Sequence, residues 1–139
     1  MTARQLAAPP YQGFSEKWRT RFEFFDTTGG PSNKATYLAV VRALSFWKKR
    51  LVLTNFFSIF FGFIYWGVFL RLWKKALTLL LIDLALGLVL AILDVPDGVA
   101  SGIGIGLNLT FARAANYAYY LKQVKGQESW NPIEGLPFF

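Results

Sequence analysis

Three apolar blocks follow one another in the middle of this chain, and they constrain its fold more than any other feature. They cover residues 51–70, 76–93 and about 99–121. Blocks of roughly 20 apolar residues match the thickness of a bilayer. A soluble domain of this size would instead distribute its apolar residues periodically over amphipathic elements. The pattern predicts an all-α integral membrane protein.

The polar flanks complete a four-part organisation. We expect a disordered N-terminus over residues 1–13 and a cytoplasmic or interfacial helical hairpin over residues 14–50. The membrane domain then covers residues 51–121, and a cytoplasmic tail covers residues 122–139.

The first helix of the predicted hairpin has an aromatic face. It is expected from Phe14 to Asp26, and the second helix from about Lys34 to Lys49. Helical spacing puts four aromatic residues on one side of the first helix: Phe14, Trp18, Phe22 and Phe25. This face either packs on the protein or the membrane interface, or docks a partner.

Charges around the apolar blocks predict the topology. Basic residues flank the first block on both sides, at 48–50 and 71–75, whereas the link at 94–98 has two acids and no base. Basic residues favour the cytoplasmic side. We therefore expect the first block to be an aromatic re-entrant or interfacial hairpin that bends near Gly62 and Gly67, with a crossing helix as the alternative. Blocks two and three then form an antiparallel transmembrane pair, with both termini in the cytoplasm.

A few polar residues interrupt the membrane domain. Asp83 and Arg113 lie at depths that differ by about one helical turn, roughly 5 Å, if the link turns near Pro96. We expect either an ion pair that sets the helix register or a protonated Asp83; the alternative is a proton or ion relay. Three asparagines are further polar residues within the apolar blocks: Asn55, Asn108 and Asn116.

Small residues repeat along the third block. Gly98, Gly102 and Gly106 recur every four residues, and Ser101 widens the face. Such a face lets helix backbones approach closely. It is expected either to pack against the second block or to mediate oligomerisation.

The residue types exclude most enzyme classes. The chain has no His and no Cys, so the usual transition-metal sites and nucleophile–base pairs cannot be built. No cofactor is expected. The net charge of +7 comes from basic residues beside apolar blocks, which is typical of membrane topology and not of nucleic-acid binding.

These features favour a small non-enzymatic membrane protein that acts by protein–protein interaction with a protein partner or as a homo-oligomer. An accessory subunit, an assembly factor or an immunity protein against a membrane-acting toxin would fit. The alternative is a small oligomeric transporter or channel that uses Asp83 and Arg113.

Four segments in this order resemble one bacterial family: "KWRTRFEFFD", "NFFSIFFGFIYWGVFLRLWKKAL", "NYAYYLK" and "SWNP". The chain is similar to the membrane proteins catalogued as domain of unknown function 2628. The family pattern matches Asn55, the run from Phe57 to Gly62, Tyr65, Arg71 and Trp73. Many members have Pro after the Gly, where this chain has Phe63. The resemblance implies a small bacterial inner-membrane protein and no agreed activity.

Overall fold

The computed structural model describes residues 13–31, 33–134 and 136, and within them every regular element is a helix. The predicted all-helical fold is confirmed. The predicted disordered segment 1–13 lies almost wholly outside the described residues. In chain order the elements are α2 (Glu16–Thr28), α3 (Lys34–Ala43), α4 (Phe46–Leu53), α5 (Phe56–Ile64), the π-helix η1 (Tyr65–Phe69), α6 (Trp73–Ile92) and α7 (Asp97–Gln123).

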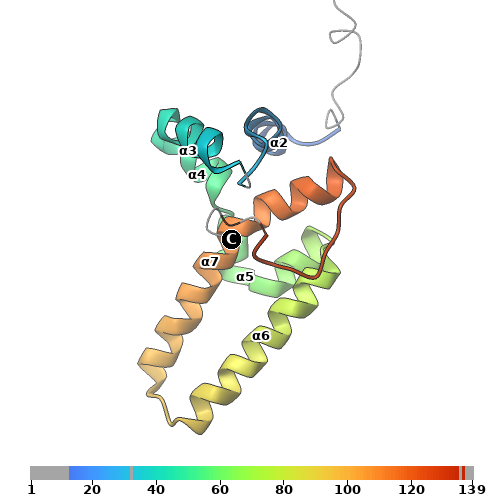
Figure 1. Ribbon diagram of the computed structural model, residues 1–139. Coiled ribbons are helices and arrows are strands. Elements are labelled where there is room, and N and C mark those ends of the chain that lie inside the picture. The colour runs from blue at the N-terminus through green and yellow to red at the C-terminus, as the bar shows by residue number, and fades with distance from the viewer. Residues whose placement is uncertain (1–12, 32, 135, 137–139) are drawn as a thin grey trace, which may run out of the picture.

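The helices form two levels (Figure 1). The short helices α2, α3 and α4 gather at one end. At the other end, α6 and α7 extend as two long arms that meet at a tight link, and α5 crosses them near the short helices. Asp94 turns the link with a positive φ of 51°, and α7 begins directly after Pro96.

The predicted helix from Lys34 to Lys49 is wrong, because two helices occupy this stretch. Leu44 is extended, with a ψ of 146°, and ends α3. Ser45 then caps α4, and its hydroxyl oxygen accepts a hydrogen bond from the backbone N–H of Lys48 at 3.4 Å. A serine that caps a new helix competes with continuation of the old one.

The aromatic face of α2 is covered by α7. Phe22 and Phe25 are 0% and 2% exposed. Their rings lie 6.0 and 5.3 Å from the ring of Tyr120. Trp18 lies 4.4 Å from the ring of Tyr119. The face therefore packs within the protein, and the alternative of a partner-docking face does not hold for its buried members.

The first apolar block folds back on itself. The indole N–H of Trp66 donates to the Ser58 hydroxyl at 2.7 Å, although a straight helix would separate eight residues by about 12 Å along its axis. Gly62 makes the bend with φ 50° and ψ −131°, a combination that glycine adopts far more readily than other residues. The bend at Gly62 is confirmed. Gly67 lies within η1 instead of at a second bend.

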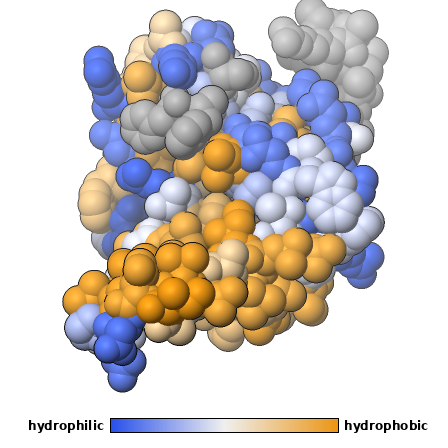
Figure 2. Space-filling model, turned by 60° about the horizontal axis from the view of Figure 1, so that its bottom comes forward, coloured by the Kyte–Doolittle hydropathy of each residue, from blue (hydrophilic) through white to orange (hydrophobic). Residues whose placement is uncertain are grey.

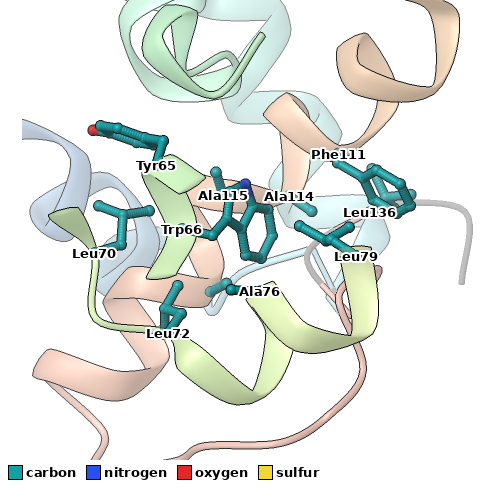
Figure 3. Packing of buried hydrophobic residues seen from close by; sticks show 11 residues of the cluster. Tyr65, Trp66, Leu70, Leu72, Ala76, Leu79, Phe111, Ala114, Ala115 and Leu136 are labelled. Carbon is teal, nitrogen blue, oxygen red and sulfur yellow. The ribbon is translucent and has the colours of Figure 1, made fainter. Parts of the chain in front are cut away.

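The returning segment fills the space between the arms. Trp66 is fully buried at the centre of a cluster, with Ala76 and Leu79 of α6 and Ala114 and Ala115 of α7 around it (Figure 3). The alanines of α7 leave room for the indole ring. The core of the molecule thus consists of the folded-back block held between α6 and α7.

Candidate functional site

The long arms present an apolar surface to the outside. Two segments are long and apolar enough to cross a membrane by length and composition, Phe46–Phe69 and Trp73–Ile92. Only 28% of the most apolar 18-residue stretch of the first segment is buried within the protein, and only 17% of that of the second. Although the first has the length of one long helix, its breaks at Asn55 and Gly62 mean that it is not a straight rod. Figure 2 shows the apolar side chains gathered in one part of the molecule, with hydrophilic side chains elsewhere.

A cleft of about 540 Å³ separates α6 from α7. Most of its walls are small or apolar side chains, among them Gly87, Ala91, Ala100 and Gly104. Its polar lining residues are Asp83, Asp97, Ser101 and Asn108. The two arms therefore enclose a partly polar space within an otherwise apolar hairpin.

Asp83 and Arg113 do not form the predicted ion pair. Salt bridges within 4.0 Å in the described residues join Lys75 to Glu134, Lys122 to Glu128 and Lys125 to Asp26. Neither Asp83 nor Arg113 takes part in one.

The reason is the position of Arg113 around α7. Asn108 lines the same cleft as Asp83, and Arg113 follows five residues later, about 140° further around the helix. Arg113 instead lines a small pocket together with Thr54, and its charge acts on Tyr37 of α3. Burial raises the pKa of Tyr37 to about 12, and the positive charge of Arg113 opposes that rise.

The small face of α7 has no neighbour in the described part of this chain. A Cβ added at Gly98, Gly102 or Gly106 would meet nothing within 4 Å. The prediction that this glycine face packs against α6 is therefore wrong. Ser101 differs from the glycines because it lines the cleft.

The three predicted intramembrane asparagines have different surroundings. Asn55 and Asn116 are buried and joined, since the Asn55 amide donates to the Asn116 carbonyl at 3.1 Å and to the Tyr65 hydroxyl at 3.2 Å. The Asn116 amide donates to the backbone carbonyls of Val52 at 2.9 Å and Leu51 at 3.3 Å. Asn108 is half-buried and lines the cleft, so the three form no continuous path.

Lys75 is a buried residue whose structural role the sequence did not reveal. It is 1% exposed, and its ammonium group donates to the carboxylate of Glu134 at 2.5 Å. It also donates to the backbone carbonyls of Ser129 and Asn131, at 3.0 Å each, and to the Ser129 hydroxyl at 2.8 Å. The C-terminal tail is therefore held on the first turn of α6, where Trp130 also packs on Trp73.

The described residues include no cluster of three or more acidic side chains that could hold a metal ion. Features available to a ligand or partner include the cleft, the uncovered glycine face and the apolar exterior.

Comparison with known proteins gives one family. The family model described as protein of unknown function (DUF2628) matches residues 9–125. Two relatives, each called "Uncharacterized protein YigF", come from Escherichia coli strain K12 and Salmonella typhimurium strain LT2. They are 34% identical over 120 residues and 32% identical over 121. Each match covers 84% of this chain and 90% of the relative. No solved structure matches the chain.

Proposed function

The chain belongs to the family described as protein of unknown function (DUF2628), and from its own residues we propose that it is a non-enzymatic bacterial inner-membrane protein that binds another membrane helix. Its α6–α7 hairpin crosses the membrane, and the cleft between the arms receives the partner.

The observation that supports membrane insertion is the exposure of large apolar side chains on the long arms. Leu88, Ile92 and Leu93 are 63%, 73% and 66% exposed, and Ile105 on the other arm is 58% exposed. At about 25 cal/mol for each Å² of apolar surface, leaving such residues in water is unfavourable. A contiguous apolar face of this kind marks a membrane or protein contact.

Aromatic and basic residues support a position for the membrane boundary. The Arg50 guanidinium lies 4.7 Å from the Phe56 ring and within 6 Å of Phe46 and Trp47. At the start of α6, Lys74 lies near Trp73 and Trp130. Such pairs suit the headgroup region, where aromatic rings and cations are enriched. Both groups lie at the end of the hairpin that is far from its acidic link.

These features support a re-entrant first block and a cytoplasmic location for both termini. Because the chain has no Cys, single cysteines report topology without a background. We expect Arg71→Cys to react with a membrane-impermeant maleimide only from the cytoplasmic side, and Asp97→Cys only from the outside. Both positions are exposed. Labelling of the cysteine at 71 from outside would show that the first block crosses.

The interaction proposal rests on Asp83 and the small walls of the cleft. A carboxyl group within an apolar helix is costly without a partner, and Asp83 forms no hydrogen bond or ion pair with another described residue. Gly87, Ala91 and Gly104 leave space for the close approach of a second helix. The partner therefore presents a small-residue face and a basic or hydrogen-bond-donating side chain.

A photocrosslinking experiment tests this proposal. In membranes, a photoreactive phenylalanine analogue at Ala91, in the cleft, is expected to capture another protein or a second copy of this chain. Asp83→Leu is expected to reduce the yield about tenfold, since an interhelical hydrogen bond contributes about 1–2 kcal/mol. The control position is Leu88, on the outer side of the same helix, where mainly lipid should be captured. Equal protein capture at both positions, or a yield independent of Asp83, would contradict docking in the cleft.

The transport alternative has one observation in its favour. Asp83, Asn108 and Asp97 line the same cleft and would offer a cation polar ligands along it. A flux in liposomes that Asp83→Asn abolishes, together with unchanged crosslinking, would favour transport over partner binding.

A further inference from the structure

A second cavity lies away from the hairpin cleft, at the junction of α2, the folded-back block and α7. Its volume is about 490 Å³. Its walls are almost entirely aromatic and include no acidic or basic side chain: Trp18, Phe57, Phe61, Tyr65, Phe69, Leu70 and Tyr119. We call this cavity the aromatic groove.

The aromatic groove opens onto the outer apolar surface. Phe57, Phe61 and Phe69 line it, yet they are 63%, 52% and 66% exposed. A hydrocarbon chain in the surrounding bilayer would therefore reach the groove without crossing a polar barrier. Its inner wall is polar at one point, because the Tyr65 hydroxyl accepts a hydrogen bond from buried Asn55.

A cation without a counter-charge stands beside the groove. The Arg21 guanidinium lies 4.4 Å from the ring of Trp18, and its Nε–H donates to the Leu51 carbonyl at 2.8 Å. No described carboxylate lies within 4.0 Å of it. Desolvation lowers the pKa of Arg21 to about 10, and interaction with Tyr65 partly opposes this. A guanidinium that has lost water is stabilised by an anion, and its planar donors match a phosphate.

Two tyrosine hydroxyl groups make part of the groove lining polar. The Tyr65 O–H has no acceptor among the described residues, although its oxygen accepts a hydrogen bond from Asn55. Figure 3 shows this hydroxyl pointing away from the buried cluster around Trp66. Tyr119 also lines the groove and adds a second hydroxyl group to it. The Tyr65 ring stacks on Phe57 at 5.8 Å and on Phe69 at 5.5 Å between ring centroids, so a hydroxyl group adjoins the exposed phenyl rings.

We propose that the aromatic groove binds one anionic phospholipid, with an acyl chain along the phenylalanines and the headgroup phosphate beside Arg21. The proposal rests on the proposed membrane location. The absence of acidic residues from the lining disfavours a cationic ligand, and the apolar entrance disfavours a free phosphate. The lipid would join α2 to the folded-back block, since Trp18 belongs to one and Phe57 to the other.

The test compares two lipids on the purified full-length protein in mild detergent. Binding of phosphatidylglycerol and phosphatidylcholine is measured by native mass spectrometry. Phosphatidylglycerol is expected to bind about tenfold more tightly, because the choline cation of phosphatidylcholine offsets its phosphate charge and repels Arg21, whereas glycerol is neutral. Arg21→Gln is expected to remove this preference. The matched control is Lys17→Gln, which removes the same charge from an exposed position on α2 and should leave the preference intact.

A second pair of variants tests the contact with the acyl chain. Arg21 is unchanged in both variants, so a folding defect caused by its loss cannot affect the result. Phe61→Ser is expected to weaken the binding of both lipids severalfold, whereas Phe60→Ser should change the binding of neither. Phe60 is 78% exposed and does not line the groove. Equal binding of the two lipids by the unaltered protein, or equal effects of the two Phe variants, would overturn the proposal.

The outcomes separate this proposal from the membrane proposal. Before purification, the cell membranes are washed with alkaline carbonate, which removes proteins that are not inserted in the bilayer. Whether the protein stays in the membrane fraction is then measured. A protein that resists carbonate but shows no lipid preference contradicts only the lipid site. A protein released by carbonate contradicts the proposed membrane location. Asp83→Asn should alter neither lipid measurement, since Asp83 lines the other cleft.

Discussion

Asn116→Leu is expected to destabilise the folded protein by about 2–4 kcal/mol, because it leaves buried polar groups without partners. Asn116 is 0% exposed and donates to the Val52 carbonyl near the end of α4, where helix carbonyls lack partners within the helix. It also accepts the amide of Asn55, which caps α5. Leucine has a similar volume but satisfies neither group. The measurement is the unfolding free energy in mild detergent, followed by tryptophan fluorescence.

The control is Asn108→Leu on the same helix. Asn108 is half-buried, and its side chain forms no hydrogen bond with another described residue. The same chemical change should therefore shift the unfolding free energy by no more than about 0.5 kcal/mol. The Leu51 carbonyl keeps a donor in both variants, since Arg21 also donates to it. Equal destabilisation by the two substitutions would show that the Asn55–Asn116 contact contributes little.

The same contact shows how far the sequence alone leads. Hydrophobic periodicity predicted that the chain is helical and where the long apolar helices lie, since these depend on neighbouring residues. The conflict between charge and topology predicted the bend at Gly62. Asn55 and Asn116 were recognised as polar residues in apolar surroundings, but they are 61 positions apart. Their pairing depends on how α5 packs against α7, which no local pattern encodes.

The predicted Asp83–Arg113 pair failed for a related reason. Counting residues from the link gives the height of a side chain along a helix, but not its direction around the helix. The block that precedes α6 also lies between the arms and separates them, as Trp66 shows. A model with only two packed helices has no place for it. Of the predicted aromatic face, Trp18, Phe22 and Phe25 lie on α2, whereas Phe14 precedes the helix. The tyrosines of α7 that cover this face lie about a hundred residues further along the chain.

Lys75→Met is expected to release the C-terminal tail from α6. The substitution keeps the length and apolar part of the side chain but removes all four hydrogen bonds to Ser129, Asn131 and Glu134. Removing one member of a buried ion pair costs about 3–5 kcal/mol. Glu134 is 27% exposed and regains water when the tail detaches, so we expect about 2 kcal/mol, or a roughly 30-fold increase in tail opening. Hydrogen exchange of residues 126–134 measures it.

Lys74→Met is the matched control, because it removes the same charge from the neighbouring position. Lys74 lies 5.8 and 6.0 Å from the rings of Trp73 and Trp130, and an exposed cation–π contact contributes only about 0.5–1 kcal/mol. Exchange in the tail should therefore change less than about fivefold. Glu134→Gln should increase exchange in the tail by an amount between those of the two lysine variants, since its amide oxygen still accepts a hydrogen bond from Lys75 but carries no charge. If Lys75→Met and Lys74→Met opened the tail equally, the ammonium group of Lys75 would not be what holds it.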